Sequence, residues 1–425
     1  MDFTPTEAQL DLARLTGEVC EKLVTADRLR ELDGGTAKFD EPLWKSLAET
    51  GVLAAALPEE IGGSGFGTLE QTAILRELGK SVAAVPYLWS IVLGAGALAR
   101  FGSAAQRDLA AAAAAGNSIL TVAVAEEHNW DPARPTATAV GSGDGWQVTG
   151  VKTTVPVADR AARILVPASV SGQAAVFLVD PSHESVTVTA QQVTDRSAES
   201  LVEFTDSPAE LLGTVESGEQ ILTWLLDRAW LGLAAQQLGT LERSLELVGD
   251  YAREREQFGR AIGSFQAVAQ RLSDAYISTQ GLRLTVTQAA WQLSEDLDAT
   301  AAVHTAKFWA AEAGHQVAHT LVHVHGGVGI DRDHIVHNYF TAAKHNEFVL
   351  GGATNHLLPL AQFVPESASR SRPVSGITAD RPPASRTWRR RTHSSAVCAE
   401  LSAGVAVEQR SSPARVPADS AGHAA

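Results

Sequence analysis

The hydrophobic period of this chain changes twice, and this feature constrains its fold more than any other. From residue 5 to about residue 116, apolar residues recur mostly at the spacing of helices. From about residue 118 to residue 213, segments such as WQVTGVKTTV alternate with period two, which is typical of strands. From residue 216 the helical period returns. We therefore predict an α+β protein that is mainly α, with a helical domain over 1–117, a compact β domain over 118–213 and a second helical domain over 214–362.

The second helical region carries four long apolar stripes. They cover residues 231–248, 268–293, about 301–324 and about 338–360. In the first stripe, apolar residues from Leu231 to Val248 step by three and four positions. Long apolar stripes joined by short loops are what a four-helix bundle requires, so we predict such a bundle over residues 214–362.

Composition limits the class of protein. The chain has 425 residues, of which 45% are hydrophobic and 20% charged, enough for two or three domains with a large apolar core. Its net charge of −15 argues against nucleic acid as the main partner. The start MDFTPTEAQL has no basic or apolar region typical of a signal peptide, and no apolar run of about 18 residues occurs. Cys20 and Cys398 match no metal or redox spacing. We expect a cytoplasmic protein that does not enter the membrane.

The last part of the chain, residues 363–425, is rich in Arg, Ser, Pro and Ala and shows no hydrophobic period. Such a composition cannot bury enough apolar surface to fold, so we predict a disordered tail.

Five histidines lie close together in the sequence and suggest a metal site: His323, His325, His334, His337 and His345. No Cys, Asp or Glu pattern completes a known set of ligands around them. We expect ordinary structural or cofactor-loop histidines and no metal.

Four motifs, in order along residues 1–362, resemble those of the acyl-CoA dehydrogenase family. They are LPEEIGGSGFG, GWQVTGVKTTVPVADRAARILV, YAREREQFGRAIGSFQAVAQRLSDAY and HVHGGVGIDRDHIVHNYF. The resemblance implies that family's fold, in which a β-barrel-like domain lies between a helical domain and a four-helix bundle. It also implies FAD as cofactor, an acyl-CoA thioester as substrate and an electron-transfer flavoprotein as acceptor. The reaction that the resemblance implies is α,β-dehydrogenation.

The YAREREQFG motif supplies the first expected cofactor residues. A planar guanidinium suits a diphosphate oxygen, and the resemblance puts Arg255 on the FAD of a neighbouring subunit. It also implies FAD contacts for Gln257, Phe258 and Gln266. Taken alone, Arg255 is explained as well by a surface salt bridge with a nearby Glu.

The glycine loop supplies further expected contacts. His323 takes the place of the family's Gln, while Gly326 and Gly327 would let the backbone approach the cofactor. The alternative for the two glycines is a turn that ends a helix. By resemblance, Thr354 and Asn355 contact FAD.

The β domain departs from the family pattern. In AVAEEHNWDP only the acid, at Glu126, matches the family's flavin loop, and the small hydroxyl residues are absent. Thr154 takes a position beneath the flavin ring where it can donate a hydrogen bond, but the family's Trp is replaced.

Both positions that hold the catalytic Glu in this family are vacant here. Gly351 occupies one, within FVLGGATNHL, and Ala229 occupies the other. A carboxylate takes the α proton in this reaction, and neither residue can move a proton. Glu347 and Asp227 are the nearest displaced candidates, and exposed helix acids are the alternative explanation for both.

These two vacancies resemble the base-lacking subunit of actinobacterial heteromeric acyl-CoA dehydrogenases of the steroid side-chain type. The resemblance implies a homologous partner subunit in an α2β2 assembly, with the base on the partner and a bulky, steroid-derived thioester. Two alternatives stay open. One is a self-sufficient homotetramer with a displaced acid, and the other is a non-catalytic subunit that binds acyl-CoA or serves as a scaffold.

Overall fold

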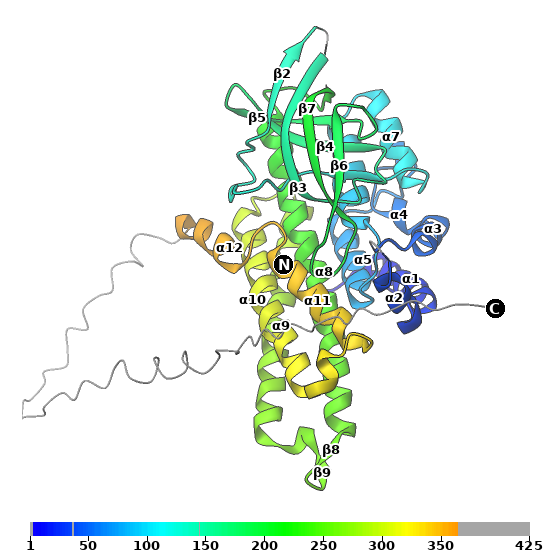
Figure 1. Cartoon of the computed structure of the whole chain (residues 1–425), viewed down its shortest axis with the longest axis vertical. Coiled ribbons are helices and arrows are strands. Elements are labelled where there is room, and N and C mark those ends of the chain that lie inside the picture. Colours follow the sequence, from blue (N-terminus) through cyan, green and yellow to red (C-terminus); the bar gives the residue numbers. More distant parts are fainter. Residues whose placement is uncertain (1–2, 36–37, 144, 364–425) are drawn as a thin grey trace, which may run out of the picture. The chain divides into compact units, whose positions relative to one another are not determined.

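The computed structural model describes residues 3–35, 38–143 and 145–363 (Figure 1). Helices, then strands, then helices follow one another along the chain, which confirms the predicted mainly helical α+β fold with a central barrel and C-terminal helices. The domain boundaries at residues 117, 213 and 362 stay a prediction. Apart from Phe363, the predicted tail lies outside the described residues.

Short helices build the N-terminal region. They are α1 (Glu7–Leu23), α2 (Ala26–Asp33), α3 (Glu41–Glu49), α4 (Val52–Ala55), η1 (Glu59–Ile61), α5 (Thr68–Lys80), the π-helix η2 (Tyr87–Ala95), α6 (Gly96–Phe101) and α7 (Ala104–Ala114). Polar caps fix several of the starts, because the side chains of Thr6, Thr25 and Ser103 each accept a hydrogen bond from the amide three residues on.

Seven strands form the central sheet. They are β1 (Leu120–Val122), β2 (Thr138–Ser142), β3 (Gly145–Pro156), β4 (Arg163–Val170), β5 (Gln173–Val179), β6 (Val186–Gln191) and β7 (Glu199–Leu211). The order β4-β2-β3-β7-β5 closes on itself because β5 also pairs with β4, while β1 extends from β4 and β6 from β7. Val148, Val166 and Phe177 fill the interior. Closure removes most free strand edges.

Long helices form the C-terminal region. They are α8 (Gly218–Glu254), α9 (Gln266–Ser294), α10 (Thr300–His325), α11 (Ile335–Phe348) and α12 (Ala353–Leu360), with the short elements β8 (Glu256–Gln257), β9 (Arg260–Ala261), η3 (Ile262–Ser264), η4 (Gly326–Ile330) and η5 (Ala361–Phe363). In Figure 1, α8 runs from beside the barrel to the β8–β9 hairpin at the far end of the bundle.

Two glycines allow α5 and α8 to pack closely. A Cβ atom on Gly239 would lie 1.9 Å from the carbonyl oxygen of Arg76, and one on Gly79 would lie 2.1 Å from that of Gln236. Only glycine fits at such distances. The contact fixes α5 against the middle of the bundle, beside the cavities described below.

The fourth predicted helical stripe, over residues 338–360, is not one helix. It breaks after Phe348 and resumes at Ala353. Leu350 and Gly351 adopt positive φ values of 52° and 106°, which an α-helix does not accommodate. Apolar periodicity runs through the break, so the pattern alone did not reveal it.

None of the helices in the described residues is long and apolar enough to cross a membrane.

Candidate functional site

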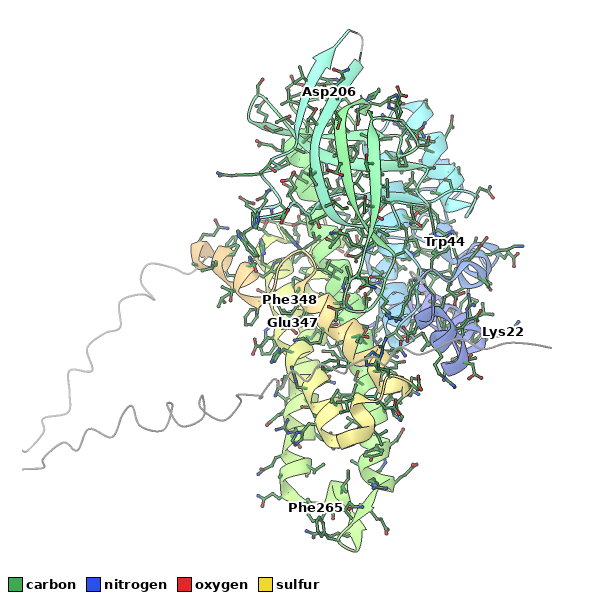
Figure 2. All side chains as sticks on the ribbon, viewed as in Figure 1. Lys22, Trp44, Asp206, Phe265, Glu347 and Phe348 are labelled. Carbon is green, nitrogen blue, oxygen red and sulfur yellow. The ribbon has the colours of Figure 1, made fainter. Side chains whose placement is uncertain are left out.

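A cavity of about 870 Å³ lies where the barrel loops face the break between α11 and α12. Its walls bring together several residues singled out from the sequence, namely Glu126, Thr154, Glu347, Gly351, Thr354 and Asn355. Glu347 and Phe348 are labelled at this level of the bundle in Figure 2. We call it the outer cavity. Its size suits a cofactor-sized ligand.

The turn between α11 and α12 forms one wall of the outer cavity and is held from behind. The indole of Trp230 and the ring of His356 both donate to the carbonyl oxygen of Leu350, each at 3.1 Å. The ammonium of Lys307 donates to the carbonyl oxygens of Gly351 at 2.9 Å, Asn346 at 3.1 Å and Glu347 at 3.3 Å. Five side-chain hydrogen bonds therefore fix a turn of unusual backbone geometry.

A pair of buried histidines supports this turn. Nδ1 of His304 lies 2.9 Å from Nδ1 of His356. His356 Nε2 must carry hydrogen because a carbonyl only accepts, so in the neutral ring its Nδ1 is an acceptor and His304 Nδ1 is the donor. Burial lowers the pKa of His304, and burial with the nearby charge of Lys307 lowers the pKa of His356 to about 3. Both rings are neutral near pH 7.

Lys307 is a fully buried lysine within an apolar stretch of α10. Burial lowers its pKa to about 7, while the charge of Glu347 acts in the opposite direction. Three carbonyl oxygens match the three donors of an ammonium group, whereas a neutral amine offers two. Lys307 therefore closes the C-terminal end of α11 and joins it to the turn.

The vacant base positions are filled by neighbouring atoms. A Cβ atom on Gly351 would lie 3.0 Å from both Cβ of Asn355 and Nε2 of His356. Ala229 is fully buried in the core of α8. Neither position offers room for a longer side chain without movement of the turn or of the core.

Glu347 and Asp227, the displaced candidates, are not the exposed helix acids considered above. Glu347 is 8% exposed and lines the outer cavity, but its oxygens lie 2.5 Å from Lys344 Nζ and 3.2 Å from His315 Nδ1. Asp227 is half-buried, burial raises its pKa to about 6, and it does not line the outer cavity. Glu347 is thus near the expected place but already bound.

The barrel side of the outer cavity is also internally bonded. Glu126 accepts hydrogen bonds from Lys152 Nζ at 2.7 Å and from the amides of Thr136 and Ala137. Burial would raise the pKa of Glu126, but Lys152 and the amide donors lower it to about 2. Glu126 therefore anchors the loop that precedes β2 and is not a free acid.

Thr154 sits in a bulge of β3 with φ of 48°, and its amide donates to Gln191 Oε1 at 2.7 Å. Across the outer cavity, Asn355 Oδ1 accepts from the amide of Gly352 at 3.2 Å, and Thr354 lies in the first turn of α12. The structure thus brings Thr154, Thr354 and Asn355 to one cavity, and their role in binding FAD stays a prediction.

The other expected cofactor residues lie at the far end of the bundle. Arg255, Gln257 and Gln266 are exposed, and Phe258 is 93% exposed on the β8–β9 hairpin. Arg255 makes no side-chain hydrogen bond or ion pair with any residue that the structure describes, so the salt-bridge alternative is not supported. In Figure 2, Phe265 marks this end, well away from Glu347.

The glycine loop belongs to the same far end. Tyr251 of α8 stacks on His325 of α10 with ring centroids 4.3 Å apart, which joins the ends of the two helices. His323 is exposed, and Gly326 ends α10 with φ of 63°, as the helix-ending alternative had it. Cβ atoms on Gly326 or Gly327 would meet nothing within 4 Å. The open backbone faces space outside the chain.

Three residues that the sequence reasoning missed support the turn from behind: His304, Lys307 and His356. A signal existed, because His304 and Lys307 are polar residues within the apolar run AAVHTAKFWAAEA. Among the described residues, no group of three or more His, Cys, Asp or Glu side chains is arranged to hold a metal ion.

Comparison with known proteins assigns two parts of the chain to family models. The acyl-CoA dehydrogenase N-terminal domain matches residues 6–116, and the acyl-CoA dehydrogenase C-terminal domain matches residues 216–362. Among individual relatives, acyl-CoA dehydrogenase FadE27 of Mycobacterium tuberculosis is 48% identical over 379 residues, covering 86% of this chain and 100% of the relative.

Two solved structures are similar over most of the chain. The ChsE4–ChsE5 complex from Mycobacterium tuberculosis superimposes with a TM-score of 0.81 at 47% identity, covering 88% of this chain and 100% of the matched chain. A variant of the steroid ACAD Tcur3481–Tcur3483 gives a TM-score of 0.81 at 37% identity, with coverage of 85% and 99%.

Proposed function

The chain belongs to the acyl-CoA dehydrogenase family, and from this premise we propose that it is a subunit of an FAD-dependent acyl-CoA dehydrogenase whose base comes from a partner subunit. The partner is a homologous chain with an intact carboxylate. One observation carries the proposal. The turn at Gly351 is closed by five hydrogen bonds from the chain's own interior, while Arg255 at the far end is exposed and unpaired within the described residues.

The same contacts bear on which of the residues near the turn could act as the base. A general base must lie within hydrogen-bond reach of the proton that it removes, with a lone pair available. Gly351 and Ala229 have no such group, and the carboxylate of Glu347 is held at one oxygen by Lys344 and at the other by His315. We therefore assign the α proton of the thioester to a carboxylate outside this chain.

The far end of the bundle fits a diphosphate-bearing cofactor held by a neighbour. Arg255 offers a planar set of donors, and the open backbone at Gly326 and Gly327 permits close approach. We assign Arg255, Gln257, Phe258, Gln266 and His323 to contacts across the subunit interface. FAD, when bound there, supplies the acceptor for the β hydride, and the family's electron-transfer flavoprotein removes the electrons.

The outer cavity differs from the far end in the donors that it offers to a cofactor. The amide of Thr154 is bonded to Gln191, and Asn355 caps its own helix. The hydroxyls of Thr154 and Thr354 remain, but among the described residues no guanidinium lines this cavity. We therefore expect this chain's own cavity to retain FAD less well than the site completed by Arg255.

The acyl group is proposed from the relatives. A solved structure at 37% identity is described as a steroid ACAD, and one at 47% identity is a complex of two different chains. The first supports a steroid-derived thioester for this protein, and the second supports a heteromeric assembly.

Co-expression with a homologous chain that has an intact base tests the proposal. The expected product is a complex of equal numbers of both chains that contains FAD and oxidises acyl-CoA in a dye-coupled assay. This chain purified alone should show little or no activity. Full activity of the isolated chain with bound FAD would contradict a partner-supplied base.

Glu347→Gln in the complex is the sharper test of where the base lies. We expect activity within about threefold of the wild type, because the carboxylate is not the proton acceptor. Replacement of the partner's carboxylate should instead lower the rate by about 10²–10⁴-fold, the usual contribution of general base catalysis. A similar loss from Glu347→Gln would favour a self-sufficient enzyme with a displaced acid.

A further inference from the structure

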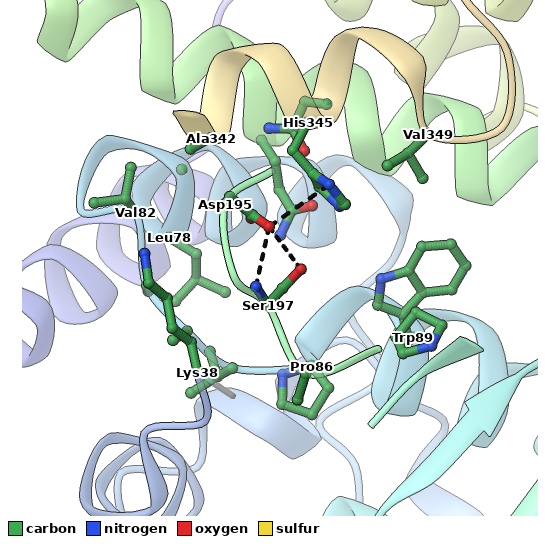
Figure 3. Close-up of a pocket in the computed structure, with 18 of the residues that line it drawn as sticks. Lys38, Leu78, Val82, Pro86, Trp89, Asp195, Ser197, Ala342, His345 and Val349 are labelled. Carbon is green, nitrogen blue, oxygen red and sulfur yellow. Dashed lines mark hydrogen bonds and ion pairs between the residues drawn. The ribbon is translucent and has the colours of Figure 1, made fainter. Parts of the chain in front are cut away.

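A second, smaller cavity of about 140 Å³ lies next to the outer cavity (Figure 3). We call it the inner cavity. It lies between the end of α5, the start of β7, α8 and α11, and Leu78, Val82 and Trp89 form part of its apolar wall. Asp195 and His345 also line it and are joined by a dashed line in Figure 3.

Three residues line both cavities: Glu199, His345 and Val349. Each therefore has one side toward the outer cavity and one toward the inner cavity. Two of the three carry ionisable side chains. The boundary between the cavities is polar, although much of the wall beyond it is apolar.

His345 is doubly paired at this boundary. Its Nε2 lies 3.0 Å from Oε1 of Glu199, and its Nδ1 lies 3.6 Å from Oδ1 of Asp195. Ring nitrogens that both face carboxylates are best matched by the doubly protonated imidazolium. Asp195 is fixed in turn by Ser197, whose amide and hydroxyl both donate to Oδ1.

Glu199 keeps one oxygen without a partner. The residue is 6% exposed, and its Oε2 has no hydrogen-bond partner among the described residues. Lys38, which also lines the inner cavity, is already bound to Asp33 at 2.6 Å and to Asn338 at 3.2 Å. A buried carboxylate oxygen of this kind requires a donor such as water, which a hydrocarbon chain cannot supply.

The chemistry of α,β-dehydrogenation makes this boundary important. The α and β carbons must lie beside the flavin, so the rest of the acyl chain must extend into space that adjoins the cofactor cavity. Within this chain, the inner cavity shares a wall with the outer cavity and has the apolar surface that such a chain needs.

We propose that Glu199 and His345 form a charged partition that excludes an acyl chain from the inner cavity. The two residues act on specificity: they reserve the inner cavity for water or another small hydrogen-bond donor. This inference rests on the proposed function, because the partition would explain why the thioester reacts at the site that the partner completes. The partition itself concerns ligand binding by this chain alone, so it can be wrong even if the proposed function is right.

Calorimetric titration of the full-length chain without its partner tests the partition. Octanoyl-CoA and free CoA are the two ligands, and the ratio of their affinities measures what the acyl chain contributes. For the wild type we expect a ratio near one. For the double variant Glu199→Leu/His345→Leu, which removes both partition charges together, we expect the ratio to rise at least tenfold, because each buried CH₂ group is worth about fourfold in affinity.

Glu199→Gln is the matched control. It keeps the size and polarity of the partition, and the ratio should stay near one. If the double variant does not fold, Glu199→Met, which retains the His345–Asp195 contact, takes its place with a smaller expected rise. A wild-type ratio of ten or more overturns the proposal, and so does a folded Leu or Met variant whose ratio does not rise. The titrations with octanoyl-CoA and with free CoA require neither flavin nor the partner chain. Failure of the partition can therefore be distinguished from failure of the proposed function.

Discussion

The turn at the outer cavity and the far end of the bundle differ in whether their polar groups have hydrogen-bond partners within the described chain. At the turn, the carbonyl of Leu350 accepts two hydrogen bonds, and those of Asn346, Glu347 and Gly351 each accept one from Lys307. At the far end, Arg255 is unpaired within the described residues. In the first region the carbonyl groups are satisfied by side chains of this chain, whereas in the second the donors of Arg255 are free to bind a ligand or another subunit.

The glycines of the two regions differ in the same way in how much room surrounds them. Gly351 is crowded, since a Cβ atom there would lie 3.0 Å from His356. Gly326 and Gly327 are open, since Cβ atoms there would meet nothing within 4 Å. A crowded glycine serves the packing of its own chain, while an open one leaves room for a ligand or another subunit. Changes in the two regions should therefore affect different properties: stability in the first, binding in the second.

The largest effect is expected from Lys152→Met on the barrel side of the outer cavity. Lys152 is fully buried and paired with Glu126 at 2.7 Å, so the variant leaves a buried carboxylate without its cation. We expect a loss of about 3–5 kcal/mol in the free energy of unfolding, measured with urea. Lys45→Met, at a largely exposed residue, is the control and should change it by less than about 0.5 kcal/mol. If Lys152→Met and Lys45→Met changed the free energy of unfolding equally, the ion pair between Lys152 and Glu126 would not stabilise this part of the barrel.

Lys307→Met should have the next largest effect. It removes the donor shared by three carbonyl oxygens at the turn, and we expect a loss of about 2–3 kcal/mol in unfolding free energy. Lys22→Met, at an exposed position, is the control. A variant as stable as the wild type would show that the turn does not depend on Lys307.

Arg255→Ala tests the far end. In the complex we expect FAD affinity to fall about 10–100-fold, the value of a lost charge-assisted hydrogen bond, while the unfolding free energy of the chain changes little. Arg253→Ala is a close control, because Arg253 is already paired with Asp250. Unchanged FAD retention after Arg255→Ala would contradict a contact between Arg255 and the FAD of the neighbouring subunit.

Gly351→Ala and Gly327→Ala compare the two kinds of glycine directly. Gly351→Ala should cost about 1–2 kcal/mol of stability, because φ of 106° strains any L-residue and the new methyl group meets His356. Gly327→Ala should leave stability nearly unchanged but weaken FAD binding in the complex. If both variants lose stability equally, the distinction between crowded and open glycines is wrong.

The smallest effect concerns pH. Burial lowers the pKa of His345, but Asp195 and Glu199 raise it more, so that it lies above the ordinary value of 6.5. The stabilisation is fully present below pH 6.5 and is lost as pH rises through the raised pKa. Melting temperatures of the wild type and His345→Gln should therefore converge as pH increases from about 6 to 9. A difference that grows with pH would contradict a protonated His345.

Periodicity predicted the fold because burial sets it. β3 and β7 alternate between buried and exposed residues over part of their length, and the long helices α8 to α10 bury apolar residues at helical spacing. Both periods are visible in the sequence, although β4 and β5 are buried almost throughout. The break at residues 349–352 was missed because Phe348, Val349 and Leu350 continue the apolar pattern. Only the two glycines after them marked the end of α11.

Thr154, Thr354 and Asn355, which a motif or a family position singled out, line one cavity, while their contacts with FAD stay a prediction. By contrast, Lys307 and Glu199 gain their significance from contacts that are distant in sequence, such as that between Lys307 and Gly351. A single sequence does not encode such pairs locally. The burial of Glu347 was missed for the same reason.

The crowded geometry at Gly351 also bears on how such a chain evolves. Replacement of Gly351 by Glu would place a long side chain at a residue with φ of 106°, where a Cβ atom would already lie 3.0 Å from His356 Nε2. If the proposed function holds, a return to a self-sufficient catalyst therefore requires the histidine pair and the turn to change together with residue 351.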